Sequence, residues 1–241
     1  TNIYPTAASN ISIRIAMGPA NNNSYGFFYI GGIKIIYTDP AIPEPPLAHQ
    51  QAPIIINIGG TNSAAYTGMD NSPQTITDLI NTNGDATTLD VQLTNTFAGM
   101  RTTPLVPTGD AAVFGEAFRT GVYGSDSDPD GQYVFRDTIT NLSYTFIFTG
   151  TCEGVPGGEN RETAYRLTGA AANTVYLDTA NNSNQVVVIS NALPSVTGEF
   201  ILDIQKGPNN DNVSGYFYLN AIMIAATNLP PPPTGTVLMV R

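Results

Sequence analysis

The fold class is decided by residues 200–224, which read Phe200-Ile-Leu-Asp-Ile-Gln205, then Gly207-Pro-Asn-Asn-Asp-Asn212, then Tyr216-Phe-Tyr-Leu-Asn-Ala-Ile-Met-Ile224. In the first part Phe200, Leu202 and Ile204 occupy every second position, which is the period of a strand with one face on a core. The middle part is a turn cluster. The last part is almost continuously apolar, as in a strand inside a sandwich sheet. We therefore expect two core strands joined by an Asn-rich loop.

The same pattern occurs a second time, at the beginning of the chain. Residues 5–38 align without a gap to 194–227, and 12 of the 34 aligned positions are identical. The identities include Phe28-Tyr29 with Phe217-Tyr218. Self-similarity at a fixed spacing is the signature of a repeat architecture. The sequence therefore predicts tandem repeats, with residues 1–38 forming the C-terminal strands of a preceding repeat.

Proline-rich segments follow each copy of the pattern. Residues 39–52 contain four prolines and are predicted to be a stiff, extended linker. Residues 53–228 are then predicted to be one complete repeat. Residues 229–241 begin with a second proline run and contain a candidate first strand of a following repeat. The chain is expected to be a window onto a longer array.

The composition indicates an all-β protein. Only 12% of the 241 residues are charged, while the chain has 23 Gly and 18 Pro, which suits short strands joined by many turns. One short helix is predicted over 72–84, from Ser72-Pro73 to Gly84, because Ile76, Leu79 and Ile80 have helical spacing. Seven further strands are predicted at 53–58, 89–94, 133–139, 144–150, 164–168, 174–178 and 185–190. This spacing favours a jelly-roll-like β-sandwich.

Charge and reactive residues exclude several functional classes. The net charge is −10 and the nine basic residues are scattered, so a nucleic-acid partner is not expected. The one cysteine, Cys152, and the one histidine, His49, lie far apart, and His49 falls in the predicted linker, so a catalytic Cys–His pair is not expected. No apolar run is long enough for a membrane span. We expect a non-catalytic protein without membrane insertion.

Several short strings in the complete unit resemble a known group of modules. They are Tyr144–Gly150, Asn160–Tyr165, Thr168-Gly169, Asn181–Ser183 and Tyr216–Ile222. In this order they resemble the galactose-binding-like, carbohydrate-binding-module-like β-sandwiches that are repeated in large exported surface proteins of Bacteroidota. The resemblance implies a jelly-roll fold, a secreted or cell-surface location, and an adhesive or carbohydrate-binding role. It supplies no binding residues.

An acidic loop is the candidate metal site. Asp126, Asp128, Asp130 and Gln132 stand at alternate positions, Gly131 allows a sharp turn, and Asp137 occupies the twelfth position. Calcium prefers oxygen ligands from carboxylates in this spacing. The flanks are strand-like rather than helical, so a solvated acidic turn is the alternative. The sequence predicts Ca²⁺ as the only candidate cofactor.

Arg161 and Glu162 are the candidate ligand-binding residues. They follow a glycine-rich loop and would hold a sugar hydroxyl, although a purely structural pairing is the alternative. The aromatic residues at 27–29 and 216–218 are expected to be mostly core, with a few facing outward. Trp is absent, which disfavours a flat aromatic platform for sugar.

Two functions remain. The first is a repeat segment of a secreted cell-surface adhesin or fibre, which contacts neighbouring repeats or subunits through many weak interactions. The second is a carbohydrate-binding module of a larger secreted polysaccharide-acting enzyme, which needs a concave site with converging polar groups.

Overall fold

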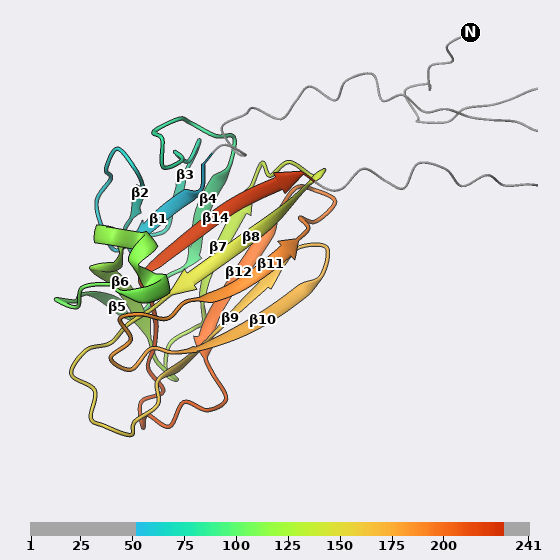
Figure 1. The fold of residues 1–241 in the computed structure, drawn as a ribbon. Helices are drawn as coiled ribbons and strands as arrows, with labels where there is room; N and C mark the ends of the chain where they lie inside the picture. The colour runs from blue at the N-terminus through green and yellow to red at the C-terminus, as the bar shows by residue number, and fades with distance from the viewer. Residues whose placement is uncertain (1–51, 229–241) are drawn as a thin grey trace, which may run out of the picture. The chain divides into compact units, whose positions relative to one another are not determined.

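The computed structural model describes residues 52–228. The predictions for residues 1–38, 39–52 and 229–241, and for His49, fall almost entirely outside the described residues and stay predictions. The described residues form two large β-sheets packed face to face, with a third small sheet at one end (Figure 1). The all-β sandwich with a single helix is confirmed.

The first large sheet has five strands in the order β11-β8-β14-β1-β2. The bounds are β11 Val187–Ala192, β8 Leu142–Thr149, β14 Ala221–Asn228, β1 Ile54–Ile58 and β2 Thr67–Met69. The chain's last described strand pairs antiparallel with its first, so that Ile54 lies opposite Ile224. The apolar run predicted as one strand from 216 to 224 is divided: its first part forms the short strand β13, Phe217–Leu219, of another sheet, and its second part begins β14, the middle strand of this sheet.

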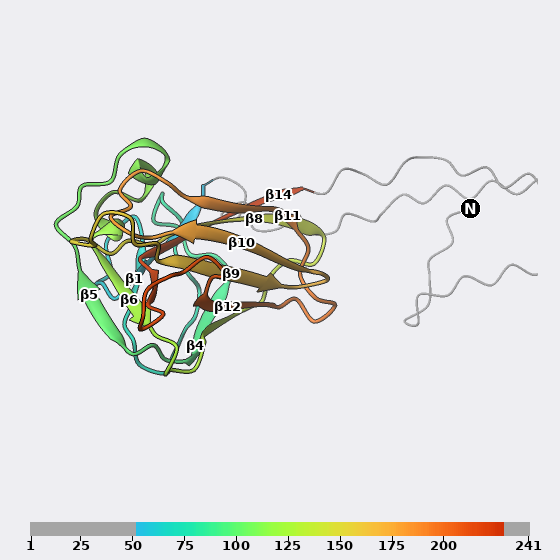
Figure 2. The ribbon, with the colours of Figure 1, turned by 90° about the horizontal axis from the view of Figure 1, so that it is seen from below.

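The second large sheet has six strands in the order β10-β9-β12-β7-β4-β3. The bounds are β10 Ala172–Asp178, β9 Glu162–Thr168, β12 Phe200–Lys206, β7 Gly131–Arg136, β4 Asp90–Asn95 and β3 Gln74–Ile76. Phe200, Leu202 and Ile204 are fully buried, as their period predicted. Figure 2 shows the two sheets as separate layers, with β14, β8 and β11 in one and β9, β12 and β4 in the other.

Aromatic side chains fill the space between the layers. Phe146 of β8 lies edge-on to Phe135 of β7 and to Phe200 of β12, with ring centroids 5.3 and 5.0 Å apart. Phe148 stacks on Tyr165 of β9 with a centroid distance of 5.2 Å and an interplanar angle of 1°. Such pairs stabilise by about 0.5–1.5 kcal/mol beyond the burial of their area. They join the two sheets into one core.

The helix lies elsewhere than predicted. Residues 72–84 contain β3, which pairs with β4 so that Ile76 lies opposite Val91. The β-branched run Thr75-Ile76-Thr77 favours a strand, and Asp78 has a φ of 54°, which an α-helix does not tolerate. The apolar spacing in this stretch reflects a hairpin edge and a buried Leu79 rather than a helical face.

The one helix of the described residues is the 3₁₀ segment η1, Gly109–Phe118, which is kinked at Gly115. Its Phe114 and Phe118 pack with Ile55 and Met223 on the outer face of the five-stranded sheet. Figure 1 shows this segment beside the lower ends of β1 and β14. The interrupting glycine hides the apolar period, so the sequence did not reveal it.

The small sheet closes one end of the sandwich. Its order is β13-β6-β5, with bounds β13 Phe217–Leu219, β6 Thr120–Gly124 and β5 Gly99–Thr102. Asn220 separates β13 from β14 and lets the chain pass from one sheet to the next. Its buried amide accepts from the Thr151 N–H at 2.8 Å and donates to the Phe118 carbonyl at 2.9 Å. This small sheet carries the candidate site.

Candidate functional site

Three tyrosines gather on the outer face of the small sheet. Tyr123 of β6 lies directly opposite Tyr218 of β13, and Tyr216 precedes Tyr218 by two positions on the same face. The ring centroids are 5.9 Å apart for Tyr123–Tyr216, 6.4 Å for Tyr123–Tyr218 and 6.5 Å for Tyr216–Tyr218. Phe217, which stands between Tyr216 and Tyr218 in the sequence, is buried in the core. The period of two therefore separates a core residue from two site residues.

Glycine makes room for this cluster. Gly99 of β5 lies opposite Tyr123, and a Cβ there would lie 2.9 Å from the Tyr123 hydroxyl and 3.0 Å from its ring. A larger residue would displace the ring. The glycine is therefore required by the close approach of the Tyr123 side chain to the β5 backbone.

Arg101 of β5 completes a pocket of about 210 Å³ with Tyr123, Tyr216 and Tyr218. The Arg101 guanidinium carbon lies 5.5 Å from the Tyr218 ring centroid, which is the distance of a cation–π contact. Tyr123 and Tyr216 are half-buried, and among the described residues neither of their hydroxyl groups has a hydrogen-bond partner. The pocket thus offers two aromatic faces, two hydroxyls and a guanidinium.

A second arginine supports the pocket from behind. Arg161 precedes β9, and its guanidinium donates to the Tyr218 hydroxyl at 2.6 Å and lies 5.7 Å from the Tyr216 ring centroid. Glu159 accepts from Arg161 Nε at 2.6 Å and from Asn212 Nδ2 at 2.6 Å. These two hydrogen bonds hold the pKa of the Glu159 carboxyl below its usual range. Burial, the largest single effect, lowers the pKa of Arg161, but the hydrogen bond to Glu159 together with Tyr218 and Cys152 raises it above its usual value.

Cys152 lies between the two guanidinium groups. Arg101 Nη1 is 2.7 Å and Arg161 Nη1 is 2.9 Å from its sulfur, so both arginines donate to one acceptor. The residue is only 3% exposed, and its neighbours are donors rather than a base. Cys152 therefore ties the two arginines together. Burial and the adjacent Cys152 raise the pKa of Tyr218.

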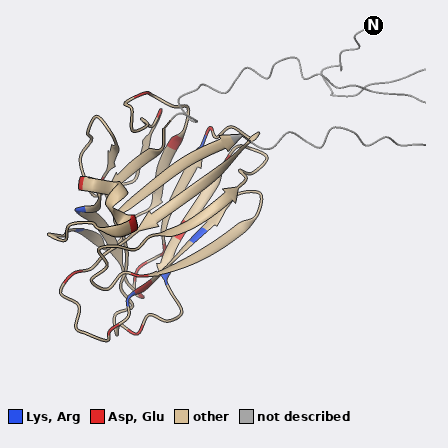
Figure 3. Ribbon diagram, in the orientation of Figure 1, with Lys and Arg blue, Asp and Glu red and all other residues tan. Residues whose placement is uncertain are grey.

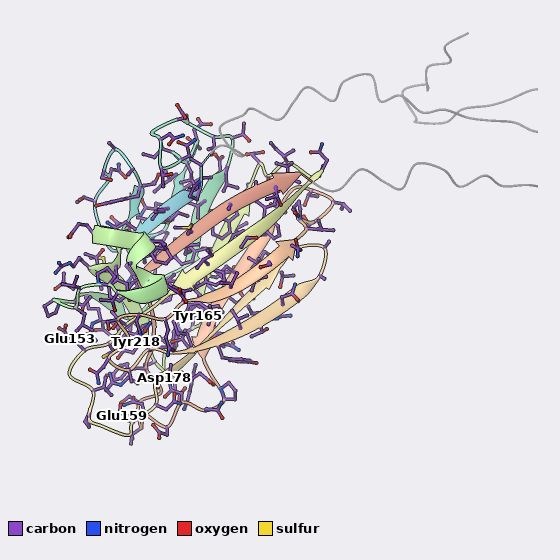
Figure 4. The ribbon with its side chains drawn as sticks, viewed as in Figure 1. Glu153, Glu159, Tyr165, Asp178 and Tyr218 are labelled. Carbon is purple, nitrogen blue, oxygen red and sulfur yellow. The ribbon has the colours of Figure 1, made fainter. Side chains whose placement is uncertain are left out.

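The two positive charges are balanced locally. Arg161 faces Glu159, and Arg101 Nη2 lies 3.8 Å from Glu153 Oε1, whose other oxygen accepts from Thr103 Oγ1 at 2.8 Å. Figure 4 shows Glu153, Glu159 and Tyr218 at the same end of the sandwich. A balanced pair of cations and anions around aromatic rings favours a neutral polar ligand over a strongly charged one.

The site is anchored to the core. Tyr165, which stacks on Phe148, donates its hydroxyl to the Tyr218 carbonyl at 2.7 Å, and Thr163 Oγ1 accepts from the Tyr218 N–H at 3.0 Å. Burial raises the pKa of Tyr165. Asp178, also labelled in Figure 4, accepts from the backbone N–H of Arg161 at 3.0 Å. Strand β13 and Arg161 are therefore held by β9 and β10.

The predicted ligand-binding pair is divided by the structure. Arg161 belongs to the tyrosine cluster, where it contacts Tyr218 and Glu159. Glu162 turns to the Asn-rich loop, where its carboxylate accepts from the Asn209 N–H at 2.9 Å and from Asn209 Nδ2 at 3.1 Å. Arg161 thus supports the pocket, whereas Glu162 fixes a loop.

The predicted calcium ligands occupy separate contacts. Asp126 pairs with Lys206 at 2.7 Å, Asp128 accepts from Ser125 Oγ at 2.6 Å, and Gln132 donates to Asp203 at 2.7 Å. Partial burial and the neighbouring Asp203 raise the pKa of Asp130. Asp137 lies just beyond the end of β7 with a φ of 55°. Residues 52–228 contain no group of three or more His, Cys, Asp or Glu side chains arranged to hold a metal, so calcium binding stays a prediction.

Arg101 and Tyr123 were missed by the sequence reading, because no strand was expected between 95 and 132. The outward direction of Tyr216 and Tyr218 is visible in their alternation with Phe217 and Leu219. The glycines at 99, 121 and 124 are the other indication of this site in the sequence, because glycines in strands mark places where other groups approach the backbone closely.

No protein-family model and no curated protein matches the chain. Solved structures with similarity include a calcium-binding mutant of Bacteroides uniformis β-glucuronidase 2, with 12% identity and a TM-score of 0.39 over 76% of this chain and 18% of that one. A second is the Podospora anserina GH26-CBM35 β-(1,4)-mannanase, with 15% identity and a TM-score of 0.29 over 68% of this chain and 29% of that one. A third is the F5/8 type C domain of a Bacteroides fragilis protein, with 14% identity and a TM-score of 0.31 over 57% of this chain and 91% of that one.

The chain spans less than a third of the length of the first two matched chains. Among the described residues, no helix is long and apolar enough to cross a membrane.

Proposed function

We propose that this chain is a non-catalytic carbohydrate-binding β-sandwich unit of a secreted cell-surface adhesin, and that the pocket of Arg101, Tyr123, Tyr216 and Tyr218 holds the sugar. The observation that carries the proposal is this pocket. It is lined by residues in or next to strands of the small sheet, and it combines aromatic faces with polar groups. In the absence of Trp, the tyrosines supply the apolar faces against which the C–H side of a sugar ring packs.

The pocket suits one sugar ring rather than a long chain. Its volume of about 210 Å³ is below the roughly 300–1,000 Å³ of sites for drug-sized ligands. The balanced charges of the two arginines and two glutamates favour a neutral sugar. A terminal or branching residue of a neutral polysaccharide is the ligand that this site fits.

The adhesin assignment draws on the repeat rather than on the pocket. Residues 5–38 carry Phe27 and Tyr29 at the positions of Tyr216 and Tyr218. An array of such units would gain avidity from many weak sites. The alternative is a carbohydrate-binding module within a larger secreted polysaccharide-acting enzyme, and the intact mass and domain content of the native protein separate the two.

The test is a glycan array probed with the 241-residue chain, followed by calorimetry on the best ligand. Tyr216→Ala should weaken binding about ten-fold, which corresponds to about 1.4 kcal/mol. Val113→Ala, a change at an exposed side chain of η1 outside the pocket, is the control and should leave binding unchanged. No saturable binding to any neutral glycan, or an equal loss in both variants, would refute the proposal.

A further inference from the structure

One edge of the sandwich is formed by a stretch of chain with almost no charge. Residues 167–198, which contain β10 and β11 and are called here the β10–β11 flank, have Asp178 as their one charged side chain. The whole chain has 28 charged side chains, of which 19 are acidic. In Figure 3, β11 and most of β10 are tan, the colour of residues other than Lys, Arg, Asp and Glu. An uncharged stretch of this length sets the flank apart from the rest of the acidic surface.

The flank also exposes apolar side chains. The exposed fractions are 48% for Tyr176 of β10, 42% for Val188 of β11 and 41% for Leu193, which follows β11. Strand β10 is the first strand of the six-stranded sheet and β11 is the first of the five-stranded sheet, so both are edges. The two edges lie next to each other in Figures 1 and 2.

Strand β10 has an unprotected edge. It pairs with β9 over all seven residues in an unbroken register, and among the described residues no strand pairs with its other side. Natural edge strands are usually blocked by Lys, Pro, a bulge or a cover. Residues Ala172–Leu177 contain no Lys, no Pro and no bulge. By contrast, β11 has a register irregularity between Ile189 and Ala192.

We propose that β10 pairs with β10 of a second copy of this unit, antiparallel and related by a two-fold axis at Val175. The net charge of −10 makes two copies repel each other over most of their surface. At this flank they meet without opposed like charges. The two-fold register places Tyr176 opposite Thr174, an aromatic–β-branched pair, and Asp178 opposite the uncharged Ala172. A second copy is therefore the partner that fits.

Outward-facing residues of β10 allow the pairing to be tested without disturbing the core. Thr174 and Tyr176 are exposed, whereas Leu177 is 3% exposed and Val175 packs against the core. The biological purpose of this pairing rests on the proposed adhesin role. In an adhesin, the pairing would join neighbouring repeats or parallel chains side by side.

The experiment is sedimentation velocity on the 241-residue chain from about 1 µM to about 1 mM. We expect a concentration-dependent dimer. The double variant Thr174→Lys with Tyr176→Lys should raise the dissociation constant at least about ten-fold, because the lysine at position 174 of one copy then opposes the lysine at position 176 of the other. Mixing it with the variant Thr174→Glu with Tyr176→Glu should restore a mixed dimer. Thr75→Lys, an exposed change on the opposite edge strand β3, is the control and should dimerise as the wild type does.

A chain that stays monomeric up to the highest concentration would overturn the proposal. So would a dimer that survives the double lysine change, or one that is lost equally in Thr75→Lys. Circular dichroism of each variant shows whether it is folded, and the charge-swapped mixture distinguishes a lost contact from a lost fold. Sugar binding is measured on the same samples. A dimer without sugar binding would refute the proposed function and leave the pairing standing.

Discussion

At the scale of single residues, the site depends on one sulfur atom that receives two guanidinium donors. Arg101 and Arg161 come from opposite sides of Cys152, and their Nη1 atoms lie 2.7 and 2.9 Å from its sulfur. The sulfur satisfies donors that would otherwise be buried without an acceptor. This contact gives the lone cysteine a structural role, which agrees with the non-catalytic function that we propose.

Replacing this acceptor should destabilise the unit. We expect Cys152→Ala to lower the free energy of unfolding by about 1–3 kcal/mol, the cost of leaving buried donors without a partner. Cys152→Ser retains an acceptor and should lose less. Urea unfolding of both variants checks the order, and equal losses would show that the sulfur acts by packing alone.

Glu159 should make the stability of the site sensitive to acid. Hydrogen bonds from Arg161 and Asn212 hold the pKa of Glu159 below its ordinary value of 4.5. The folded state therefore gains stability from the ionised carboxylate above about pH 4.5, and loses it as the pH falls through the lower pKa of the folded state. Glu159→Gln should melt below the wild type at pH 7 and approach it at low pH.

The control for that experiment is Glu116→Gln. Glu116 pairs with Arg119 at 3.5 Å on an exposed part of η1, where an ion pair adds little stability. Its melting temperature should follow that of the wild type at every pH. A difference for Glu159→Gln that persists at low pH would point to lost packing rather than to the charge.

At the scale of elements, the two copies of the repeated pattern differ at two positions that are buried in the second copy. Lys34 stands at the position of Met223, and Gly31 at the position of Asn220. Met223 is 9% exposed and packs with Phe114 and Phe118 of η1. Residues 5–38 would therefore fit poorly in place of β12 to β14 of this sandwich.

Placing the first copy's residue in the second tests this difference. Met223→Lys should lower the free energy of unfolding by about 3 kcal/mol, because it buries an unpaired ammonium group among apolar side chains. Ile201→Lys, on the 37% exposed side of β12, is the control and should cost less than about 1 kcal/mol. Chemical denaturation measures both. Similar costs would mean that the outer cover tolerates charge.

Elements with a clear period of two were predictable from the sequence, and elements that depend on distant partners were not. Strand β12 shows its core face directly in Phe200, Leu202 and Ile204. The short strands β2, β5 and β6 have no such signal, because glycines and distant pairing set their course. Arg161 was found from its loop, but its partners Arg101 and Cys152 are 60 and 9 residues away in sequence. Only the fold brings them together.

At the scale of the whole molecule, the described residues share one large apolar cluster between their two large sheets. This cluster draws on strands from β1 to β14, all within residues 53–228. We expect the segment 53–228 to fold alone and to melt at the temperature of the 241-residue chain. The segment 53–219 should fail to fold, because it lacks β14, the middle strand between β8 and β1. Calorimetry of both segments provides the measurement.

Calcium is a second property of the whole molecule that calorimetry can address. If the loop containing Asp126, Asp128 and Asp130 binds Ca²⁺ as the sequence predicts, added calcium should raise the melting temperature and a chelator should reverse the rise. Asp128→Asn should remove the effect. An unchanged melting temperature would leave the loop as a solvated acidic turn.

The pairing of β1 with β14 has a mechanical consequence. The two strands are antiparallel neighbours, so the described unit begins and ends at the same end of one sheet, with Ile54 opposite Ile224. Tension applied at residues 53 and 228 would act first on the pairing of β1 with β14. It would break the hydrogen bonds between these two strands one after another, in an unzipping geometry. Strands pulled along their length resist with all their hydrogen bonds at once, but these strands are pulled apart sideways. If the chain belongs to the array that the sequence predicts, each unit would yield at low force and lengthen, and the array would act as an extensible tether.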